Sequence, residues 1–354
     1  MAKLFEPLCI GSITLQNRIA VSPMCEYSSE DGFANDWHLV HLGSRAVGGA
    51  GLLISEACAV SPEGRITAHD LGIWKDAHIS ELERITRFIR SQGSVAGIQL
   101  AHAGRKASCS QPWMGGKQIA IHEGGWQVVA PSAIPFTEDT MLPEAVTIEK
   151  IHQIIDDFRQ AAIRSRKAGF QVLEIHAAHG YLLHQFYSPL SNRRTDRYGG
   201  SFENRIRLLM EIVAAVQEVW PSDLPLMVRI SATDWTVGGW DLSDSVLLAG
   251  KLKEQGVHLI DCSSGGNVPH AKIPAGPGYQ VAFAREIKLK TGILTGAVGL
   301  ITGAEQAEQI LNDGSADLIL LAREMLRDPY FPLHAASQLK HDWEWPVQYQ
   351  RAKK

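Results

Sequence analysis

Two histidines and a tyrosine lie close together in the sequence, directly after an apolar run. The stretch EIHAAHGYLLHQF covers residues 174–186 and contains His176, His179 and Tyr181. Two imidazoles can donate hydrogen bonds to one carbonyl oxygen, and a neighbouring phenol can supply a proton. The same side chains can also bind a metal, hold a substrate or pack in a core. Which of these they do depends on the elements that position them.

Eight apolar runs of strand length alternate along the chain with helix-like patterns. Each run is nearly continuous, as expected for strands that are buried on both faces. The predicted strands cover residues 18–24, 50–57, 95–102, 172–179, 224–232, 258–264, 292–298 and 318–324. The predicted helices cover residues 79–92, 147–169, 201–219, 243–255, 280–291 and 302–313. This alternation predicts the α/β class, and eight units favour a single (β/α)8 TIM barrel over an open sheet.

One domain is expected over residues 1–354, with the barrel over about 18–340 and a C-terminal tail over 341–354. Two connections, 103–146 and 180–200, are far too long for simple turns, and they follow the third and fourth predicted strands. TIM barrels build their sites at the carboxyl ends of the strands, so both loops are expected to carry function. The histidine pair and the tyrosine end the fourth strand at this face, which favours a functional interpretation.

The composition narrows the class of protein. Hydrophobic residues make up 45% and charged residues 20% of the chain, which predicts a sizeable core. The net charge of −4 gives no support for a nucleic-acid partner. No run is long and apolar enough to suggest a membrane span, and the first residues, MAKLFEPLCIG, show no signal-peptide pattern. A soluble, cytoplasmic protein without a nucleic-acid or membrane partner is expected.

The five cysteines argue against a metal centre. They lie at positions 9, 25, 58, 109 and 262, and no two have the C-x-x-C spacing. That spacing is typical of structural zinc sites and of iron–sulfur clusters. A zinc site built on His176 and His179 needs at least one more ligand, and the other strand ends offer none in a suitable place. No metal is therefore expected, and a metal-dependent barrel hydrolase remains the alternative enzyme.

Glycine and arginine residues after the last two strands predict a phosphate site. Gly299 follows the seventh strand and Arg323 follows the eighth, where TIM barrels commonly bind phosphate. Taken singly, Gly299 can serve a tight turn and Arg323 can pair with a carboxylate. Arg229 and Gln99 lie at the ends of buried strands, so both need polar partners. A flat heterocycle with carbonyl and N–H groups satisfies them, and FMN combines such a ring with a phosphate.

With these residues together, the chain resembles the old yellow enzyme family of FMN-dependent ene-reductases, and most of all its bacterial subgroup with a cysteine after the first strand. The matching blocks, which extend over nearly the whole chain, are NRIAVSPMCEYS (17–28), GIQLAHAGRKA (97–107), EIHAAHGYLLHQFYSPLSNRRTDRYGGSFENRIR (174–207), VRIS (228–231), TGAVG (295–299) and AREMLRDP (322–329). The resemblance implies bound FMN and NADPH or NADH as the hydride donor. It implies a ping-pong reaction that passes hydride to the C=C bond of an α,β-unsaturated carbonyl or nitro compound.

The same resemblance implies roles for individual residues. His176 and His179 would hold the substrate oxygen, and Tyr181 would donate the proton. Tyr27 would contact the substrate, and Cys25 would lie near the reactive edge of FMN and tune its potential. The residues expected to hold FMN are Ser22, Pro23, Met24, Cys25, Ala57, Gln99, Lys106, Arg229, Ser263, Gly299, Ala322 and Arg323.

The C-terminal tail also resembles the subgroup, whereas four residues depart from the family pattern. The segment WPVQYQRAKK (345–354) is similar to the subgroup's C-terminal segment, in which an arginine reaches the site of a neighbouring subunit. Arg351 is the matching residue, which implies a homodimer or a tetramer of such dimers. The departures from the family pattern are Glu26 after Cys25, Ala322 before Arg323, and Trp235 and Trp240 after the fifth strand. A flavin-binding redox sensor that uses Cys25 is the alternative outside the enzymes.

Overall fold

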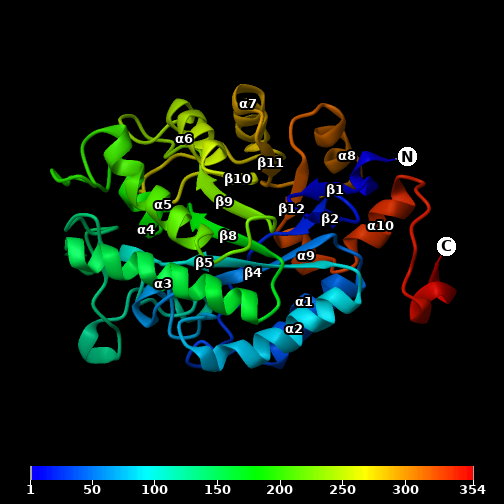
Figure 1. Cartoon of the computed structure of the whole chain (residues 1–354), viewed down its shortest axis with the longest axis horizontal. Coiled ribbons are helices and arrows are strands. Elements are labelled where there is room, and N and C mark those ends of the chain that lie inside the picture. Colours follow the sequence, from blue (N-terminus) through cyan, green and yellow to red (C-terminus); the bar gives the residue numbers. More distant parts are fainter. Residues whose placement is uncertain (1, 354) are drawn as a thin grey trace.

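Eight parallel strands close into a barrel in the computed structural model, which describes residues 2–353 (Figure 1). The barrel strands, in chain order, are β3 (Ile19–Val21), β4 (Leu52–Ala59), β5 (Val95–Ala101), β8 (Val172–Ala177), β9 (Leu226–Ser231), β10 (Leu259–Ser263), β11 (Leu294–Ala297) and β12 (Leu318–Leu321). Each strand pairs in parallel with the next in this order, and β12 pairs with β3 to close the ring. The predicted (β/α)8 barrel is therefore confirmed.

Helices cover the outside of the barrel. They are α1 (Asp36–Val47), α2 (Ile79–Ser91), α3 (Ile148–Lys167), α4 (Leu182–Tyr187), α5 (Phe202–Gln217), α6 (Leu242–Glu254), α7 (Val281–Thr291), α8 (Ala304–Asn312), α9 (Arg323–Arg327) and α10 (Phe331–Gln338). The six predicted helices are α2, α3, α5, α6, α7 and α8, with ends that differ by one or two residues. At the start of α3, the Thr147 hydroxyl accepts a hydrogen bond from the backbone N–H of Lys150, so the predicted cap is present.

The barrel interior has two layers of opposite chemistry. Because side chains alternate between the two faces of a strand, every second residue points inward. We call the lower interior, near the amino ends of the strands, the apolar layer; its strand residues are Ala20, Leu52, Ile54, Val95, Val172, Met227, Leu259, Leu318 and Leu320. We call the upper interior the polar layer; its residues are Ser22, Gln99, Glu174, His176, Arg229, Asp261 and Ser263, all of them buried.

A small hairpin closes the bottom of the barrel. Its strands are β1 (Leu8–Ile10) and β2 (Ile13–Leu15), which pair antiparallel, and Leu8, Ile10 and Leu15 join the apolar layer. The hairpin turn lies directly on the barrel, since a Cβ on Gly11 would lie 2.4 Å from the carbonyl oxygen of Asp223. Both chain ends lie on this side of the molecule, opposite α4 (Figure 1). The upper end of the barrel is left open for chemistry.

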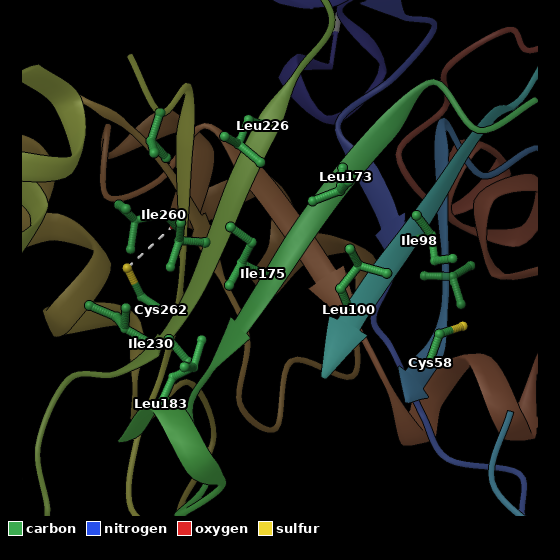
Figure 2. Packing of buried hydrophobic residues seen from close by; sticks show 14 of the residues in the cluster. Cys58, Ile98, Leu100, Leu173, Ile175, Leu183, Leu226, Ile230, Ile260 and Cys262 are labelled. Carbon is green, nitrogen blue, oxygen red and sulfur yellow. Dashed lines mark hydrogen bonds between the residues drawn. The ribbon is translucent and has the colours of Figure 1, made fainter. Parts of the chain in front are cut away.

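The outward-facing strand residues pack against the helices. Figure 2 shows Ile98 and Leu100 of β5 beside Leu173 and Ile175 of β8, in the largest buried cluster of the described residues. Each of these four side chains is fully buried. Burial at this scale is the dominant favourable contribution to folding, at about 25 cal/mol per Å² of apolar surface. Most outward-facing residues of the strands are apolar, and this explains the near-continuous runs in the sequence.

The two long connections emerge after β5 and β8. The first contains the short parallel pair β6 (Val129–Ala130) and β7 (Glu144–Ala145), and the second contains α4. The 3₁₀ turns of the chain are η1 (Lys3–Phe5), η2 (Pro62–Gly64), η3 (Asp76–His78), η4 (Gly104–Lys106), η5 (Pro112–Met114), η6 (Ile121–Glu123) and η7 (Val347–Ala352). Because both connections follow barrel strands, they rise around the open mouth.

Candidate active site

Three side chains at the end of β8 face one small region of the mouth. His176 is the penultimate residue of β8, and His179 and Tyr181 lie in the turn before α4. The centre of the His176 ring lies 5.2 Å from that of His179 and 5.1 Å from that of Tyr181, both in edge-to-face arrangements. The structure therefore brings together the two imidazoles and the phenol that the sequence singled out.

Burial keeps these three groups neutral. It lowers the pKa of His176 and of His179 far below the usual range, and the nearby Arg229 guanidinium acts in the same direction. It also raises the pKa of the Tyr181 phenol well above its usual value. The backbone N–H of Ala178 donates to Nδ1 of His176 at 3.2 Å, so the proton of that ring lies on Nε2. Neutral imidazoles and an intact phenol are hydrogen-bond donors at neutral pH.

A strained turn positions His179. Its φ of +57° lies in the left-handed region, which costs a non-glycine residue about 1–3 kcal/mol. The Lys106 ammonium donates to the carbonyl oxygens of His179 and Gly266 at 2.8 and 3.1 Å, and burial lowers its pKa to about 8. The next residue must be small, since a Cβ on Gly180 would lie 2.1 Å from the carbonyl oxygen of Gly266. Lys106 thus clamps the turn to the loop after β10.

A buried hydrogen bond between His184 and Asp234, behind this turn, was not predicted. His184 Nε2 lies 2.8 Å from Asp234 Oδ1, and both side chains are fully buried. Asp234 Oδ2 also accepts hydrogen bonds from the Ser188 hydroxyl at 2.6 Å and the backbone N–H of Trp240 at 2.8 Å. The backbone N–H of Gly180 donates to Nδ1 of His184 at 2.9 Å. His184, the third histidine of the stretch 174–186, therefore ties the catalytic turn to the loop after β9.

The hydroxyl of Ser263, at the end of β10, contacts His179. Its Oγ lies 2.7 Å from Nε2 of His179 and 3.4 Å from Oε1 of Gln280. Gln280 also accepts from the Ser264 hydroxyl at 2.6 Å and donates to the carbonyl oxygen of Val298 at 2.9 Å. This chain of hydrogen bonds links the end of β8 to the loop after β11. The sequence assigned Ser263 to the cofactor and did not predict its contact with the histidine.

Arg229 lies at the centre of the polar layer. Its Nε is 3.1 Å from Asp261 Oδ2, close enough for an ion pair but in an orientation that makes no hydrogen bond, and Nη1 donates to the Ser22 hydroxyl at 3.1 Å. Gln99 donates to Oε1 of Glu174 at 2.7 Å. Burial, with the facing Asp261 carboxylate, raises the pKa of Glu174 to about 8. The chain itself therefore supplies the anionic partner that Arg229 requires.

A cavity of about 160 Å³ lies between the loops that follow β11 and β12. Arg229, Gly299, Ala322 and Arg323 are among the residues that line it. Gly299 has a φ of +125°, and a Cβ there would lie 2.8 Å from Nε2 of Gln280. None of the salt bridges between residues 2 and 353 uses Arg323, so its guanidinium is available to a ligand. Two guanidinium groups around a small cavity suit a phosphate group.

The segment after β3 borders a larger cavity at the mouth. This mouth cavity has a volume of about 590 Å³, and Tyr27 and Tyr181 lie in its wall. Tyr27 has a φ of +49°, and its neighbour Cys25 is half-buried. Burial raises the pKa of the Cys25 thiol, and the carboxylates of Asp70 and Glu56 raise it further. Cys25 is therefore a thiol, not a thiolate, at neutral pH.

Glu26, a departure from the family pattern, turns toward α1. Its Oε2 accepts a hydrogen bond from Nε1 of Trp37 at 3.1 Å, and its Oε1 lies 3.6 Å from Nε2 of His41. Its backbone N–H donates to Oε2 of Glu56 at 3.1 Å. Burial raises the pKa of Glu26. The extra carboxyl group thus belongs to a polar cluster between β4 and α1.

The remaining predicted residues fall into two groups. Pro23 and Met24 are half-buried beside Cys25, and Ala57 is buried in β4, which is next to β3 in the barrel. Arg351 is exposed on η7, and this turn lies on the far side of the molecule from α4 and the mouth (Figure 1). Arg351 is therefore remote from its own chain's mouth.

The tryptophan departures lie around the loop after β9. Trp240 is fully buried against Tyr187, with 4.3 Å between ring centres, so its role is packing. Trp235 has a φ of +56° and packs edge-to-face against Phe283. Because a fully buried ring contacts no substrate, the Trp240 departure supports packing and not substrate choice.

Two kinds of feature are absent from residues 2–353. No group of three or more His, Cys, Asp or Glu side chains in that part of the chain is arranged to hold a metal ion. Within the same residues, no helix has both the length and the apolarity needed to cross a membrane.

The donor set at the mouth fits FMN. The cavity lined by Arg229 and Arg323 suits the phosphate, and Gly299 leaves room for close backbone approach. Arg229 Nε and Glu174 Oε2 are buried without hydrogen-bond partners among the described residues, beside the place where a ring with alternating donors and acceptors would lie. These residues would hold the ring edge and the phosphate.

Comparisons with known proteins give a consistent result. Residues 3–342 match the NADH:flavin oxidoreductase / NADH oxidase family. The chain is 52% identical over 351 residues to an NADPH dehydrogenase of Bacillus subtilis (strain 168), an alignment that covers 99% of this chain and 98% of the relative. A structure of morphinone reductase in complex with tetrahydroNAD is similar with a TM-score of 0.79 and 30% identity, covering 97% of this chain and 92% of that one. The old yellow enzyme homologue from Zymomonas mobilis gives a TM-score of 0.78 and 27% identity, with 97% and 94% covered.

Proposed function

The chain belongs to the NADH:flavin oxidoreductase / NADH oxidase family, as an old yellow enzyme that uses FMN and NAD(P)H, and on this premise we propose that it is an ene-reductase. Its substrates are alkenes conjugated to a carbonyl or nitro group. The reaction is ping-pong, with NADPH or NADH as the first substrate and the alkene as the second. FMN, held by the residues of the mouth, would supply the hydride chemistry between NAD(P)H and the alkene.

The imidazoles of His176 and His179 hold the substrate oxygen. Nε2–H of His176 is free to donate, because Nδ1 of that ring accepts from a backbone N–H. We assign the Ser263 hydroxyl, 2.7 Å from Nε2 of His179 and 3.4 Å from Oε1 of Gln280, as a donor to the histidine during the reaction, which leaves Nδ1–H of His179 for the substrate. Two neutral donors on one oxygen withdraw electron density from the alkene and stabilise the negative charge that develops there.

Tyr181 donates the proton to the α-carbon. Its raised pKa keeps the phenol protonated at neutral pH, and its ring lies 5.1 Å from that of His176. The Lys106 ammonium lies 5.1 Å from the centre of the Tyr181 ring and stabilises the phenolate that remains. Tyr27 lies in the same cavity wall as Tyr181 and contacts the substrate.

The residues that would hold FMN form two groups, one in the polar layer and one around the cavity of about 160 Å³. Arg229, Gln99 and Ser22 of the polar layer would hold the ring edge, while Gly299, Ala322 and Arg323, which line that cavity, would hold the phosphate. The rest of the ring would contact Pro23, Met24, Cys25, Ala57, Lys106 and Ser263. The neutral thiol of Cys25 tunes the flavin potential without adding charge.

The observation that carries this proposal is the convergence of two neutral imidazoles and one protonated phenol beside a cationic cavity of about 160 Å³. The test is the visible spectrum of the purified protein under anaerobic conditions. NADPH should bleach the flavin absorbance, and cyclohexenone should restore it. In Tyr181→Phe, NADPH should bleach at the normal rate while cyclohexenone restores the absorbance more slowly. Equal slowing of both steps would count against the proton-donor role.

A redox sensor is the alternative that this experiment separates. A sensor that used Cys25 would bind FMN but would not oxidise NADPH continuously in the presence of an enone. The half-buried, protonated thiol of Cys25 argues against rapid thiol chemistry, because the thiolate is the reactive form. Sustained turnover with cyclohexenone excludes the sensor.

Assembly into a homodimer, or a tetramer of dimers, accounts for the tail. Arg351 is exposed and remote from its own mouth, and Val347 and Tyr349 expose apolar surface on the same turn. In a dimer, Arg351 reaches the partner's mouth. Removal of residues 345–354 should lower the mass measured by light scattering or weaken substrate selection. An unchanged mass and unchanged selectivity would refute this role.

The cytoplasm is the compartment that fits the cysteines. All five are free in the structure, and Cys9 is exposed. Free exposed thiols are typical of reducing compartments, where disulfides are rare. The hydride donor NAD(P)H is also available there.

A further inference from the structure

Tyr181 borders a second cavity that the reaction does not use. Besides the mouth cavity, it lines a space of about 10 Å³ enclosed by β4, β5 and the segment after β4. Small residues create this space, namely Ala57, which is also expected to border FMN, Ala59, Gly64, Ala101 and Ala103. A volume of about 10–15 Å³ is what one water molecule requires, provided that polar partners are present.

Asp70 supplies the second polar wall of this cavity. Its side chain is 2% exposed and lies in the segment between β4 and α2. Oδ2 accepts from the backbone N–H of Ile66 at 2.6 Å, and Oδ1 accepts from the backbone N–H and the hydroxyl of Thr67 at 3.0 and 2.8 Å. A carboxylate has about four acceptor positions, so one remains for a water. The cavity therefore has Asp70 at one side and Tyr181 at the other.

We propose that Asp70, through one water in this cavity, returns a proton to Tyr181 after each turnover. The inference rests on the proposed function, in which Tyr181 gives its proton to the substrate. The carboxylic O–H bond of Asp70 breaks and its proton moves to the water. The water passes a proton to the phenolate, which forms the new O–H bond of Tyr181. Only protons move in this step, so nothing is oxidised or reduced, and Asp70 is left as a carboxylate.

Thr67 reconnects Asp70 with solvent. Its hydroxyl donates to Oδ1 of Asp70, and the residue also lines the mouth cavity. Solvent in that cavity restores the Asp70 proton through this hydroxyl. The water lies on the side of Tyr181 away from the mouth cavity, so the phenolate regains its proton while the product still covers its other side, and solvent reaches Thr67 after the product has left.

The surroundings of Asp70 suit this exchange. Burial raises its pKa to about 7, against the effect of its three hydrogen bonds. The titratable and charged groups that face it are Cys25, Tyr27, Glu56, Cys58, Arg65, Cys109 and Tyr181. Transfer from Asp70 to the phenolate is downhill, since the pKa of Tyr181 is far higher. Supply falls as the pH rises past about 7, where Asp70 loses its proton.

The test compares the first turnover with later ones in Asp70→Asn. The enzyme is reduced with one equivalent of dithionite, left to equilibrate so that Tyr181 is protonated, and mixed with cyclohexenone. Flavin reoxidation in this first turnover should stay within about twofold of the wild type, whereas steady-state turnover with NADPH and cyclohexenone should fall about 10-fold or more. The decline of wild-type turnover above about pH 7 should be absent in the variant. Ferricyanide accepts electrons from the flavin without protonation of a carbon. NADPH oxidation with ferricyanide should therefore be normal in the variant, which shows that the first half-reaction is intact.

Three further substitutions, at Thr67 and Ala59, keep the test independent of the folding of Asp70→Asn. Thr67→Val removes the hydroxyl and Thr67→Ser retains it, so the first should lower only steady-state turnover and the second should not. Ala59→Val, a change that suits a strand, fills the cavity without removing a polar group and should act like Asp70→Asn.

The outcomes separate this inference from the proposed function. Equal loss of first-turnover and steady-state rates in Asp70→Asn and Ala59→Val overturns the relay, and so does normal steady-state turnover in both. If Tyr181→Phe is slow with cyclohexenone while these variants behave like the wild type, the proposed function stands and only the relay is lost. If Tyr181→Phe is as fast as the wild type, the proton-donor role itself is wrong.

Discussion

The apolar and polar layers of the barrel interior are built by the same eight strands, yet they do opposite things. In the lower layer, inward residues such as Leu259 and Met227 fill space with apolar atoms. At the next inward-facing positions of the same two strands, Asp261 and Arg229 form a buried ion pair. Burying charges costs free energy that packing elsewhere must offset. The lower layer therefore serves stability, and the upper layer serves chemistry at the expense of stability.

The largest expected effect breaks the chemistry and leaves the packing intact. His176→Ala combined with His179→Ala removes both donors to the substrate oxygen. Cyclohexenone turnover should fall about 10³-fold or more, because each such donor is worth about 10²–10³ in rate. The ratio of flavin to protein absorbance should stay at the wild-type value. His122→Ala, an exposed histidine in the loop after β5, is the control and should be fully active.

The reciprocal change breaks the packing and leaves the chemistry. Leu259→Ala in the apolar layer should lower the free energy of unfolding by about 2–5 kcal/mol, as truncation of a buried leucine does. Steady-state turnover at 25 °C should change little. Urea unfolding followed by circular dichroism measures the loss. Leu247→Ala, at an exposed leucine of α6, should cost less than about 0.5 kcal/mol. A turnover defect in Leu259→Ala as large as its stability defect would erase the distinction between the layers.

The pH dependence of stability measures how much the polar layer lowers the free energy of unfolding. The folded-state pKa of Glu174, about 8, lies above the ordinary value of 4.5, so the folded chain retains a proton that the unfolded chain has lost. Stability is then complete below about pH 4.5 and falls as the pH rises toward 8. In FMN-free protein, Glu174→Gln should flatten this decline between pH 5 and 8, by about 2–4 °C in Tm. Glu83→Gln, exposed on α2, should leave the decline unchanged.

The smallest effect on turnover is expected at Ser263, which orients His179 and does not itself contact the substrate. Ser263→Ala removes the hydrogen bond to Nε2 of His179. A bond of this kind contributes about 0.5–1.5 kcal/mol, so kcat/KM for cyclohexenone should fall about 3- to 10-fold. Flavin reduction by NADPH, which involves no carbonyl oxygen, should keep its rate. A loss of bound flavin would show that the contact of Ser263 with FMN matters more than its contact with His179.

The barrel was predictable because its signals are local and repeated. The strands are apolar over most of their outer face and over the lower part of their inner face, and helix α3 carries its cap at Thr147. Helix α1 was missed because its first turn depends on Asn35 and His38, whose side chains bond one another and the backbone in a capping box that apolar periodicity does not reveal. The hairpin β1–β2 was missed because its strands are only three residues long.

The site was predictable in its residues but not in its connections. Strand ends identified His176, Arg229 and Gly299, because a barrel fixes where the ends of strands meet. Partnerships such as His184 with Asp234 join residues 50 positions apart, and no local pattern encodes them. Lys106 illustrates the same limit, since its clamp on the His179 carbonyl depends on the path of two loops.

The seam between β3 and β12 determines when the protein can first hold its cofactor. Ile19 pairs with Ile319, so the ring closes between residues 300 positions apart. During synthesis the first strand must wait for the last, while the apolar layer lacks one of its walls. Arg323, which lines the cavity expected to hold the phosphate, is also synthesised only after β12. A ribosome-bound chain halted before β12 should therefore stay colourless, and acquisition of yellow colour marks completed closure of the ring.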